Sequence, residues 1–137
     1  METKHLTYCL ASERGKKALH VEAYSRGYLQ ALLNFPHVLT REQSIAPAMI
    51  EAIMVKSSVC CIPNDTAYEQ FFASAWASAY VDVAEKLSER EIVNLVSRVK
   101  DKGDEAIASL KRIFASDEGQ ALLASSYTHM TQTYLPD

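Results

Sequence analysis

The segment from Tyr68 to Leu87, YEQFFASAWASAYVDVAEKL, decides the fold of this chain. Large apolar side chains recur in it every three or four residues, at Tyr68, Phe72, Trp76, Tyr80, Val83 and Leu87. That spacing aligns them on one face of an α-helix. Three alanines beside this face are small enough to let a neighbouring helix approach closely: Ala73, Ala77 and Ala84. We therefore expect a central helix at about residues 66–87, with the other helices packed around it.

Length and composition indicate one helical domain. The chain has 137 residues, of which 48% are hydrophobic and 23% charged, as is usual for a globular domain with one core. It contains only four Pro and four Gly, so long periodic segments are favoured over many short strands. We predict an all-α, single-domain compact bundle spanning residues 1–137, with about five to seven helices. Residues 1–12 are expected to form a loose arm or a short helix.

Two helices are expected before the central one. The first spans residues 16–35, and its core face carries Val21, Tyr24, Tyr28, Leu32 and Phe35. Gly27 interrupts this helix, and we interpret it as the site of a close helix crossing. The second begins at Thr40, with Thr40 and Gln43 as a capping box. Its expected core residues are Ile45, Met49 and Ile53, and Pro47 predicts either a kink or a break within residues 41–56.

The remaining helices are marked by caps. Ser88 and Glu91 form a capping box, as do Thr66 and Glu69 at the start of the central helix. Gly103 is expected to end the helix after Ser88 as a left-handed cap, and Ser116 to begin the last helix. The expected core residues of this half are Ile92, Leu95, Val96, Val99, Ile107, Leu110, Ile113, Phe114, Leu122, Leu123, Tyr127 and Met130.

The charge pattern argues against strong binding of nucleic acid. The net charge is −3, and the basic clusters are Arg14 with Lys16 and Lys17, and Arg98 with Lys100 and Lys102. Such a balance gives little electrostatic steering toward phosphates. The first residues contain no apolar run of signal-peptide length, and no segment is apolar enough to span a membrane. We expect a cytoplasmic protein, or a periplasmic one if an export signal has been removed.

The cysteines and histidines form no recognisable catalytic or metal-binding pattern. The chain has three cysteines, Cys9, Cys60 and Cys61, so they cannot all form pairs, and adjacent cysteines rarely bridge one another. Two interpretations remain: a disulfide from Cys9 to Cys60 or Cys61, or three buried free thiols. The histidines His5, His20, His37 and His129 are scattered and are interpreted as surface residues. No catalytic residue, metal site or cofactor is predicted.

The segment SSVCCIPND, residues 57–65, is the candidate contact with a partner. It is apolar although it is expected to form a loop between helices, and Pro63 and Asn64 favour a turn. The candidate partner-binding residues are Val59, Cys60, Cys61, Ile62, Pro63, Asn64 and Asp65. The alternative is that this loop folds onto the core.

Two fragments carry a resemblance to a known family. They are Ser25-Arg26-Gly27-Tyr28-Leu29-Gln30, and Cys61-Ile62-Pro63 followed by Thr66 and Gln70. Together they resemble the Tai-type immunity proteins, small helical proteins that neutralise type VI secretion amidase effectors in the periplasm. The resemblance covers about half of the chain, Tyr24 to Leu87. Ser25 stands where the family has a cysteine, so the disulfide expected there cannot form. The resemblance implies a helical protein that binds and blocks another protein.

The sequence thus predicts a non-enzymatic small helical protein that binds and inhibits or adapts another protein. An immunity protein, a phage- or plasmid-type inhibitor and an adaptor all fit this description. A second copy of the chain is an alternative partner. A DNA-associated regulator is the alternative class, and a thiol-dependent enzyme with a site assembled from distant residues, such as Cys60 or Cys61 with His37, is a third.

Overall fold

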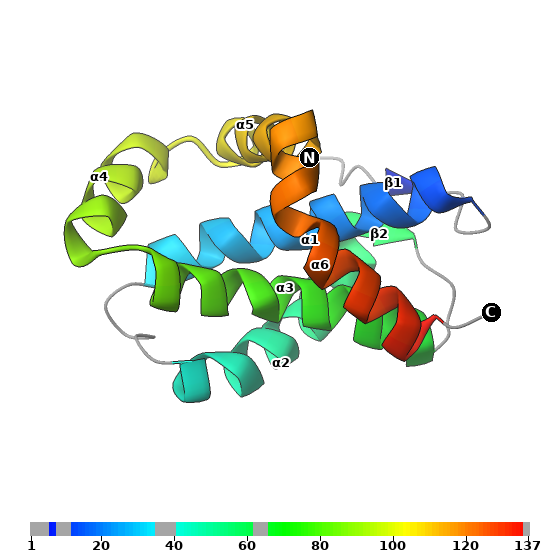
Figure 1. Ribbon diagram of the computed structural model, residues 1–137. Helices are drawn as coiled ribbons and strands as arrows, with labels where there is room; N and C mark the ends of the chain where they lie inside the picture. Colours follow the sequence, from blue (N-terminus) through cyan, green and yellow to red (C-terminus); the bar gives the residue numbers. More distant parts are fainter. Residues whose placement is uncertain (1–5, 8–11, 35–40, 62–65, 136–137) are drawn as a thin grey trace.

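The computed structural model describes residues 6–7, 12–34, 41–61 and 66–135, and the side chains within 12–34, 45–56 and 66–135. These residues form six helices and two short strands (Figure 1). In chain order the elements are β1 (Leu6–Thr7), α1 (Glu13–Asn34), α2 (Arg41–Val59), β2 (Cys60–Cys61), α3 (Thr66–Lys86), α4 (Glu89–Val99), α5 (Asp104–Ala115) and α6 (Asp117–Tyr134). The predicted all-α bundle around a central helix is confirmed.

Helix α3 lies at the centre of the bundle. It packs along α1 on one side and α2 on another, and α6 crosses it (Figure 1). Phe72, Trp76, Tyr80 and Val83 of the predicted stripe are buried, and the stripe ends at half-buried Tyr68 and Leu87. Phe71, Ala75 and Ala79 on another face are also buried. A helix that is apolar on most sides is favoured in this position, because only there can every side be covered.

The crossing of α1 and α3 is fixed by Gly27, as predicted. A Cβ atom added at Gly27 would lie 2.9 Å from the Cα of Trp76 and closer still to its carbonyl oxygen. Both obstructing atoms belong to the backbone of a buried helix, so they cannot rotate away. The two helix axes approach this closely only because residue 27 lacks a side chain.

We expect Gly27→Ala to lower the free energy of unfolding by about 1–3 kcal/mol, the usual cost of forcing extra volume into a packed core. Alanine favours the helix by about 1 kcal/mol, but the clash outweighs this gain. Urea unfolding followed by circular dichroism measures the effect. Gln30→Ala, on the same helix and half-buried, is the control and should change stability by less than about 0.5 kcal/mol. An unchanged or raised midpoint for Gly27→Ala would contradict the close crossing.

Helix α2 runs from Arg41 to Val59 as one helix with Pro47 inside it, so of the two alternatives, a kink or a break, the break is excluded. Proline removes one backbone hydrogen bond, to the carbonyl four residues earlier. That carbonyl belongs to Gln43, in the first turn of α2, so the missing hydrogen bond affects only the end of the helix.

Thr40 of the predicted capping box lies outside the described residues. In the second box, Thr66 is the first residue of α3 instead of its cap.

Two segments that were expected to be irregular form a small parallel sheet. Leu6 pairs with Cys60 and Thr7 with Cys61. A short helix at Leu6–Thr7 is therefore wrong, and the predicted loop at 57–65 begins later than expected. Ser57–Val59 extend α2, and Cys60–Cys61 form β2. Strand pairing between segments distant in the sequence overrides local propensity here.

The caps of the C-terminal half are confirmed at two serines. Ser88 Oγ accepts the N–H of Glu91 at 3.2 Å, and Glu91 Oε1 accepts the N–H of Ser88 at 3.0 Å. Ser116 Oγ accepts the N–H of Gly119 at 3.1 Å and begins α6. Gly103 has a positive φ of 52° but does not end α4. Helix α4 ends at Val99, and Gly103 immediately precedes α5.

Two predicted core residues of this half are exposed, Ile113 at 57% and Leu122 at 75%. The buried stripe of α6 runs through Gly119, Leu123, Tyr127 and Met130, and Leu122 lies beside it. A Cβ atom on Gly119 would lie 2.6 Å from the Cα of Phe114. This close approach to the end of α5 sets the rotation of α6 and turns Leu122 outward.

Candidate functional site

Helix α2 meets α3 through small side chains. Ala48 and Ala52 are fully buried against α3, where the cluster includes Phe72 and Trp76. The carboxylate of Glu51 accepts the indole N–H of Trp76 at 2.9 Å and the hydroxyl of Tyr80 at 2.8 Å. Burial, together with this hydrogen bond to Glu51, raises the pKa of Tyr80. The one carboxylate in the middle of α2 is therefore engaged with α3.

The opposite face of α2 is apolar and exposed. Ile50 is 61% exposed, Ile53 45% and Met54 76%, and the exposed Ala46 and Pro47 precede them. Their spacing places these five residues on one side of the helix. Between Ile45 and Val55 the only charged residue is Glu51. We call Ala46, Pro47, Ile50, Ile53 and Met54 the outer face of α2.

The sequence prediction assigned the core face of α2 wrongly. Ile45 and Ile53 were expected inside, but they are 36% and 45% exposed, and Met49 is half-buried. The helix carries two apolar stripes, and the alanine stripe faces α3 because the bulky aromatic rings of α3 leave little room. The outer stripe could have been found from the sequence as Ala46, Ile50, Ile53 and Met54 at helical spacing.

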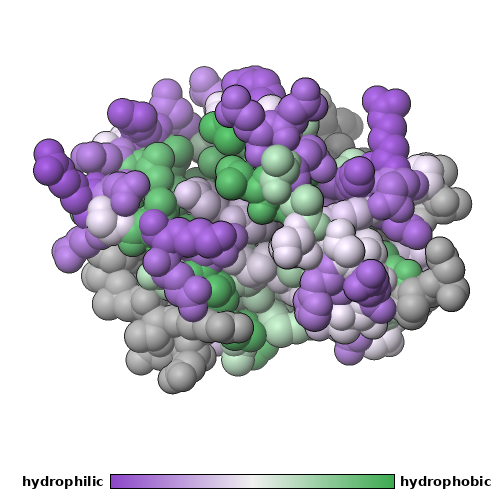
Figure 2. Space-filling view, viewed as in Figure 1, coloured by the Kyte–Doolittle hydropathy of each residue, from purple (hydrophilic) through white to green (hydrophobic). Residues whose placement is uncertain are grey.

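The outer face lies at the edge of the bundle. In Figure 1, α2 forms the lower edge and packs on α3, on the side away from α5 and α6. In the matching view of Figure 2, hydrophobic surface reaches this lower edge, whereas most of the upper edge is hydrophilic. Contiguous exposed apolar side chains of this kind are typical of contact surfaces.

The predicted contact residues follow directly after this helix. Val59 is the last residue of α2, and Cys60 and Cys61 form β2, which pairs with β1. Ile62, Pro63, Asn64 and Asp65 lie outside the described residues, as do Cys9, His5 and His37. The predicted contact through this segment, and the disulfide from Cys9, therefore stay predictions.

Ser97 of α4 and Lys100, which directly follows the last residue of α4, are both exposed. Asp82 accepts the hydroxyl of Tyr24 and lies 3.3 Å from Lys86 Nζ. Burial and this hydrogen bond to Asp82 raise the pKa of Tyr24. In the described part of the chain, no three His, Cys, Asp or Glu side chains gather as metal ligands would.

The interpretation of the histidines as surface residues is wrong for His20, which is 1% exposed. Its ring lies against Tyr24, Phe71 and Tyr127, with centroids 6.3, 5.9 and 5.5 Å away. Its Nε2 has no hydrogen-bond partner in the structure. Burial lowers the pKa of His20 to about 4, so the ring is neutral at pH 7. His129 is exposed, as expected.

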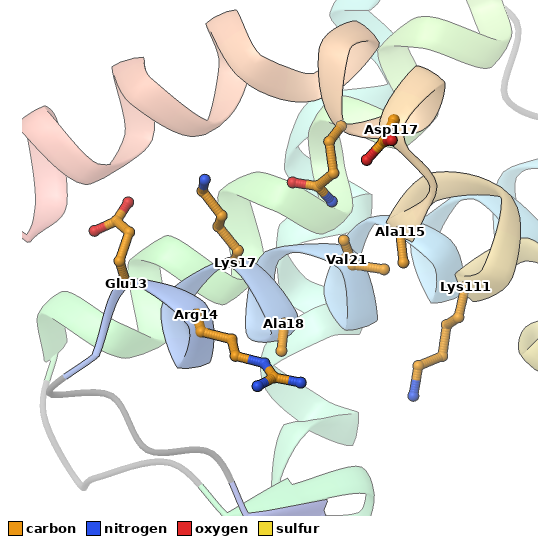
Figure 3. A pocket seen from close by; sticks show the side chains of 9 residues that line it. Glu13, Arg14, Lys17, Ala18, Val21, Lys111, Ala115 and Asp117 are labelled. Carbon is orange, nitrogen blue, oxygen red and sulfur yellow. The ribbon is translucent and has the colours of Figure 1, made fainter.

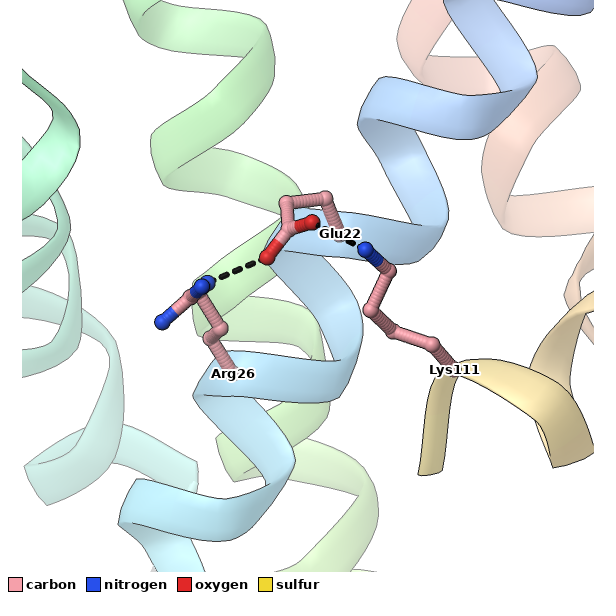
Figure 4. Close-up of polar contacts among 3 residues, drawn as sticks. All are labelled: Glu22, Arg26 and Lys111. Atoms are coloured by element: carbon pink, nitrogen blue, oxygen red, sulfur yellow. Dashed lines mark hydrogen bonds and ion pairs between the residues drawn. The ribbon is translucent and has the colours of Figure 1, made fainter. Parts of the chain in front are cut away.

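A buried carboxylate joins α1 to α5. Glu22 is fully buried, and its two oxygens contact Arg26 and Lys111, the latter at 2.6 Å (Figure 4). Burial alone would raise the pKa of Glu22, but the hydrogen bond from Lys111 and the charge of Arg26 lower it overall. Sequence reasoning missed this cluster, since Lys111 is 89 residues away from Glu22.

A second surface feature is a groove of about 770 Å³ between α1, α5 and the start of α6. Its lining comprises Glu13, Arg14, Lys17, Ala18, Val21, Lys111, Ala115, Asp117 and Gln120. Figure 3 shows the Arg14 guanidinium beside Ala18, whereas Lys17 projects from the other side of α1 toward α6 and Lys111 projects from α5. The basic cluster of Arg14 and Lys17 was visible in the sequence, but Lys111 joins it only through the fold.

Comparison with known proteins identifies no relative: no family model, curated protein or solved structure matches the chain. The resemblance to Tai-type immunity proteins is therefore neither supported nor contradicted. Among the described helices, none is both long and apolar enough to cross a membrane.

Proposed function

We propose that this protein is a non-enzymatic factor that binds another protein through the outer face of α2. The observation that carries the proposal is the row of exposed, uncharged side chains at Ile50, Ile53 and Met54. Burying this row would release apolar surface from water, which is the main favourable term in protein association. Methionine adds a flexible side chain that adapts to a partner.

The rigidity of α2 supports the same proposal. Its inner face is fixed by Ala48 and Ala52 against α3, and Glu51 holds Trp76 and Tyr80 by hydrogen bonds. A partner would therefore meet a preformed surface and would lose little entropy in ordering it. Inhibition of the partner, as an immunity protein or phage inhibitor achieves it, and adaptation of the partner are the two roles that such binding could serve.

We expect the double substitution Ile50→Lys/Met54→Lys to abolish partner capture without lowering the melting temperature. Two lysines would place charges in the centre of the contact. There, substitution of a single residue by alanine can already cost about 2 kcal/mol of binding free energy. The wild-type protein is used to capture partners from extracts of the native host, and mass spectrometry identifies the captured partners. The dissociation constant of the purified partner should then rise at least about thirtyfold for the variant.

The matched control is Ile113→Lys/Leu122→Lys, on α5 and α6. These residues are 57% and 75% exposed, against 61% and 76% for Ile50 and Met54, so the change in charge and exposure is the same. The control should bind like the wild type. Equal binding by the α2 variant would overturn the proposal. So would light scattering that finds a wild-type dimer and a monomeric α2 variant, because the partner would then be a second copy.

A further inference from the structure

We propose that the groove between α1, α5 and α6 binds a small organic anion with an apolar body, its acidic group meeting Arg14, with Lys17 supplying a second positive charge. The volume of about 770 Å³ lies within the range of small-molecule sites. The groove is on the side of the α1–α3 pair away from α2 (Figure 1), so this inference is independent of the proposed protein contact.

The floor of the groove supplies the apolar part of the site. Ala18 and Val21 follow Arg14 and Lys17 at helical spacing, so one face of α1 carries both the cations and the floor. Ala115 of α5 continues this floor from the other side. An apolar body of a ligand would lie on these three side chains.

Three cations, Arg14, Lys17 and Lys111, and two carboxylates, Glu13 and Asp117, line the groove. Arg14 and Lys17 form no ion pair within the described part of the chain, and Lys17 Nζ lies 5.9 Å from the ring centroid of Tyr127. Glu13 accepts the hydroxyl of Tyr127 at 2.6 Å, which engages one of its oxygens. Lys111 is already paired with Glu22 at 2.6 Å. Arg14 and Lys17 are therefore the cations of the lining that an anionic ligand can meet.

The opposite wall limits the charge of the ligand. Asp117, at the start of α6, also lines the groove and would repel a ligand with several negative charges. A single carboxylate, which can pair bidentately with the guanidinium of Arg14, fits better than a polyphosphate. The proposed class is therefore a monoanion of the carboxylate type attached to an aliphatic or aromatic body.

The test uses three probes of defined chemistry with the intact chain, followed by NMR. Octanoate combines the charge with the tail, acetate has the charge alone, and octyltrimethylammonium has the same tail with the opposite charge. Octanoate should shift the signals of Ala18, Val21 and Ala115 and should bind at least about tenfold more tightly than either other probe. Added salt should weaken its binding.

The variant Arg14→Gln/Lys17→Gln should bind octanoate at least about tenfold more weakly, because it loses the charge-assisted contact with Arg14 and the positive charge of Lys17. Both residues are exposed, so the fold should be unaffected. The control Lys16→Gln/Arg112→Gln also removes two positive charges, one from α1 and one from α5, at positions outside the groove lining, and should bind octanoate like the wild type. Equal binding of the cationic probe, shifts confined to the outer face of α2, or undiminished binding by the groove variant would each overturn the proposal.

Discussion

Replacing Arg26 and Lys111 together by methionine is expected to lower the free energy of unfolding at pH 7 by about 3–5 kcal/mol. Both cations contact Glu22, whose side chain is fully buried. Methionine keeps most of the apolar length of each side chain, so the packing changes little. The variant would leave a carboxylate in the core without the charges of Arg26 and Lys111, and chemical unfolding in urea measures the loss.

The decisive comparison adds a third substitution. Glu22→Gln in the doubly substituted chain removes the buried charge, so the triple variant should be more stable than the double variant despite carrying one more change. The three side chains belong to one cluster, and non-additivity of this sign is expected for such a cluster. If the triple variant is no more stable than the double, the loss comes from packing and not from the unpaired charge.

The pH dependence of the double variant should also reverse. In the wild type, the pKa of Glu22 lies below its usual value, so its contribution to stability is present at neutral pH and lost as the pH falls through that pKa. Without the two cations, the largest lowering effects are gone, and burial should raise the pKa of Glu22 above its value in the unfolded chain. The double variant should therefore gain stability as the pH falls from neutral through this raised pKa.

The Glu22 cluster also shows where sequence reasoning stops. The central helix could be predicted because its apolar residues follow a regular spacing, and the Ser88 cap because it is local. A charge paired across 89 residues leaves no local signal. A buried glutamate at position 22 looks the same in the sequence as an exposed one.

The outer face of α2 illustrates a different limit. The sequence places two apolar stripes on this helix, and periodicity does not decide which one faces the core. The choice follows from the size of the neighbouring side chains: Phe72 and Trp76 occupy the space, so Ala48 and Ala52 pack inward. The predicted contact segment at Val59–Asp65 lies next along the chain, whereas the exposed face itself was missed. Arg14 and Lys17 were noticed as a basic cluster, but the groove needs α5 and α6 to complete it.

Lowering the pH from about 6.5 to 4 is expected to cost the wild-type fold about 3 kcal/mol through His20 alone. Burial lowers the pKa of His20 to about 4, whereas in the unfolded chain it is near 6.5. Between these two values the unfolded state binds more protons than the folded state, so stability falls with the pH. Above about pH 7.5 the ring is neutral in both states and this dependence ends.

The groups that face His20 do not offset this effect. Tyr24 and Tyr127 contact its ring from α1 and α6, and burial raises the pKa of each, so both stay neutral throughout this range. Phe71 contacts it from α3 and has no titratable group. Behind this shell lie Glu13, hydrogen-bonded to Tyr127, Lys17, above the Tyr127 ring, and Asp82, hydrogen-bonded to Tyr24. A protonated His20 would thus be surrounded by aromatic rings and would lack an adjacent carboxylate.

The variant His20→Phe should therefore lose this dependence and keep the full stability of the fold at pH 7. Phenylalanine replaces a ring whose Nε2 is buried without a partner, so no hydrogen bond is lost. In urea unfolding at pH 7, 6, 5 and 4, the midpoint of this variant should not show the decrease with falling pH that His20 causes in the wild type. His129→Phe, at an exposed position, should follow the wild-type curve. If His20→Phe declines as steeply as the wild type, carboxylates and not His20 govern the acid sensitivity of the fold.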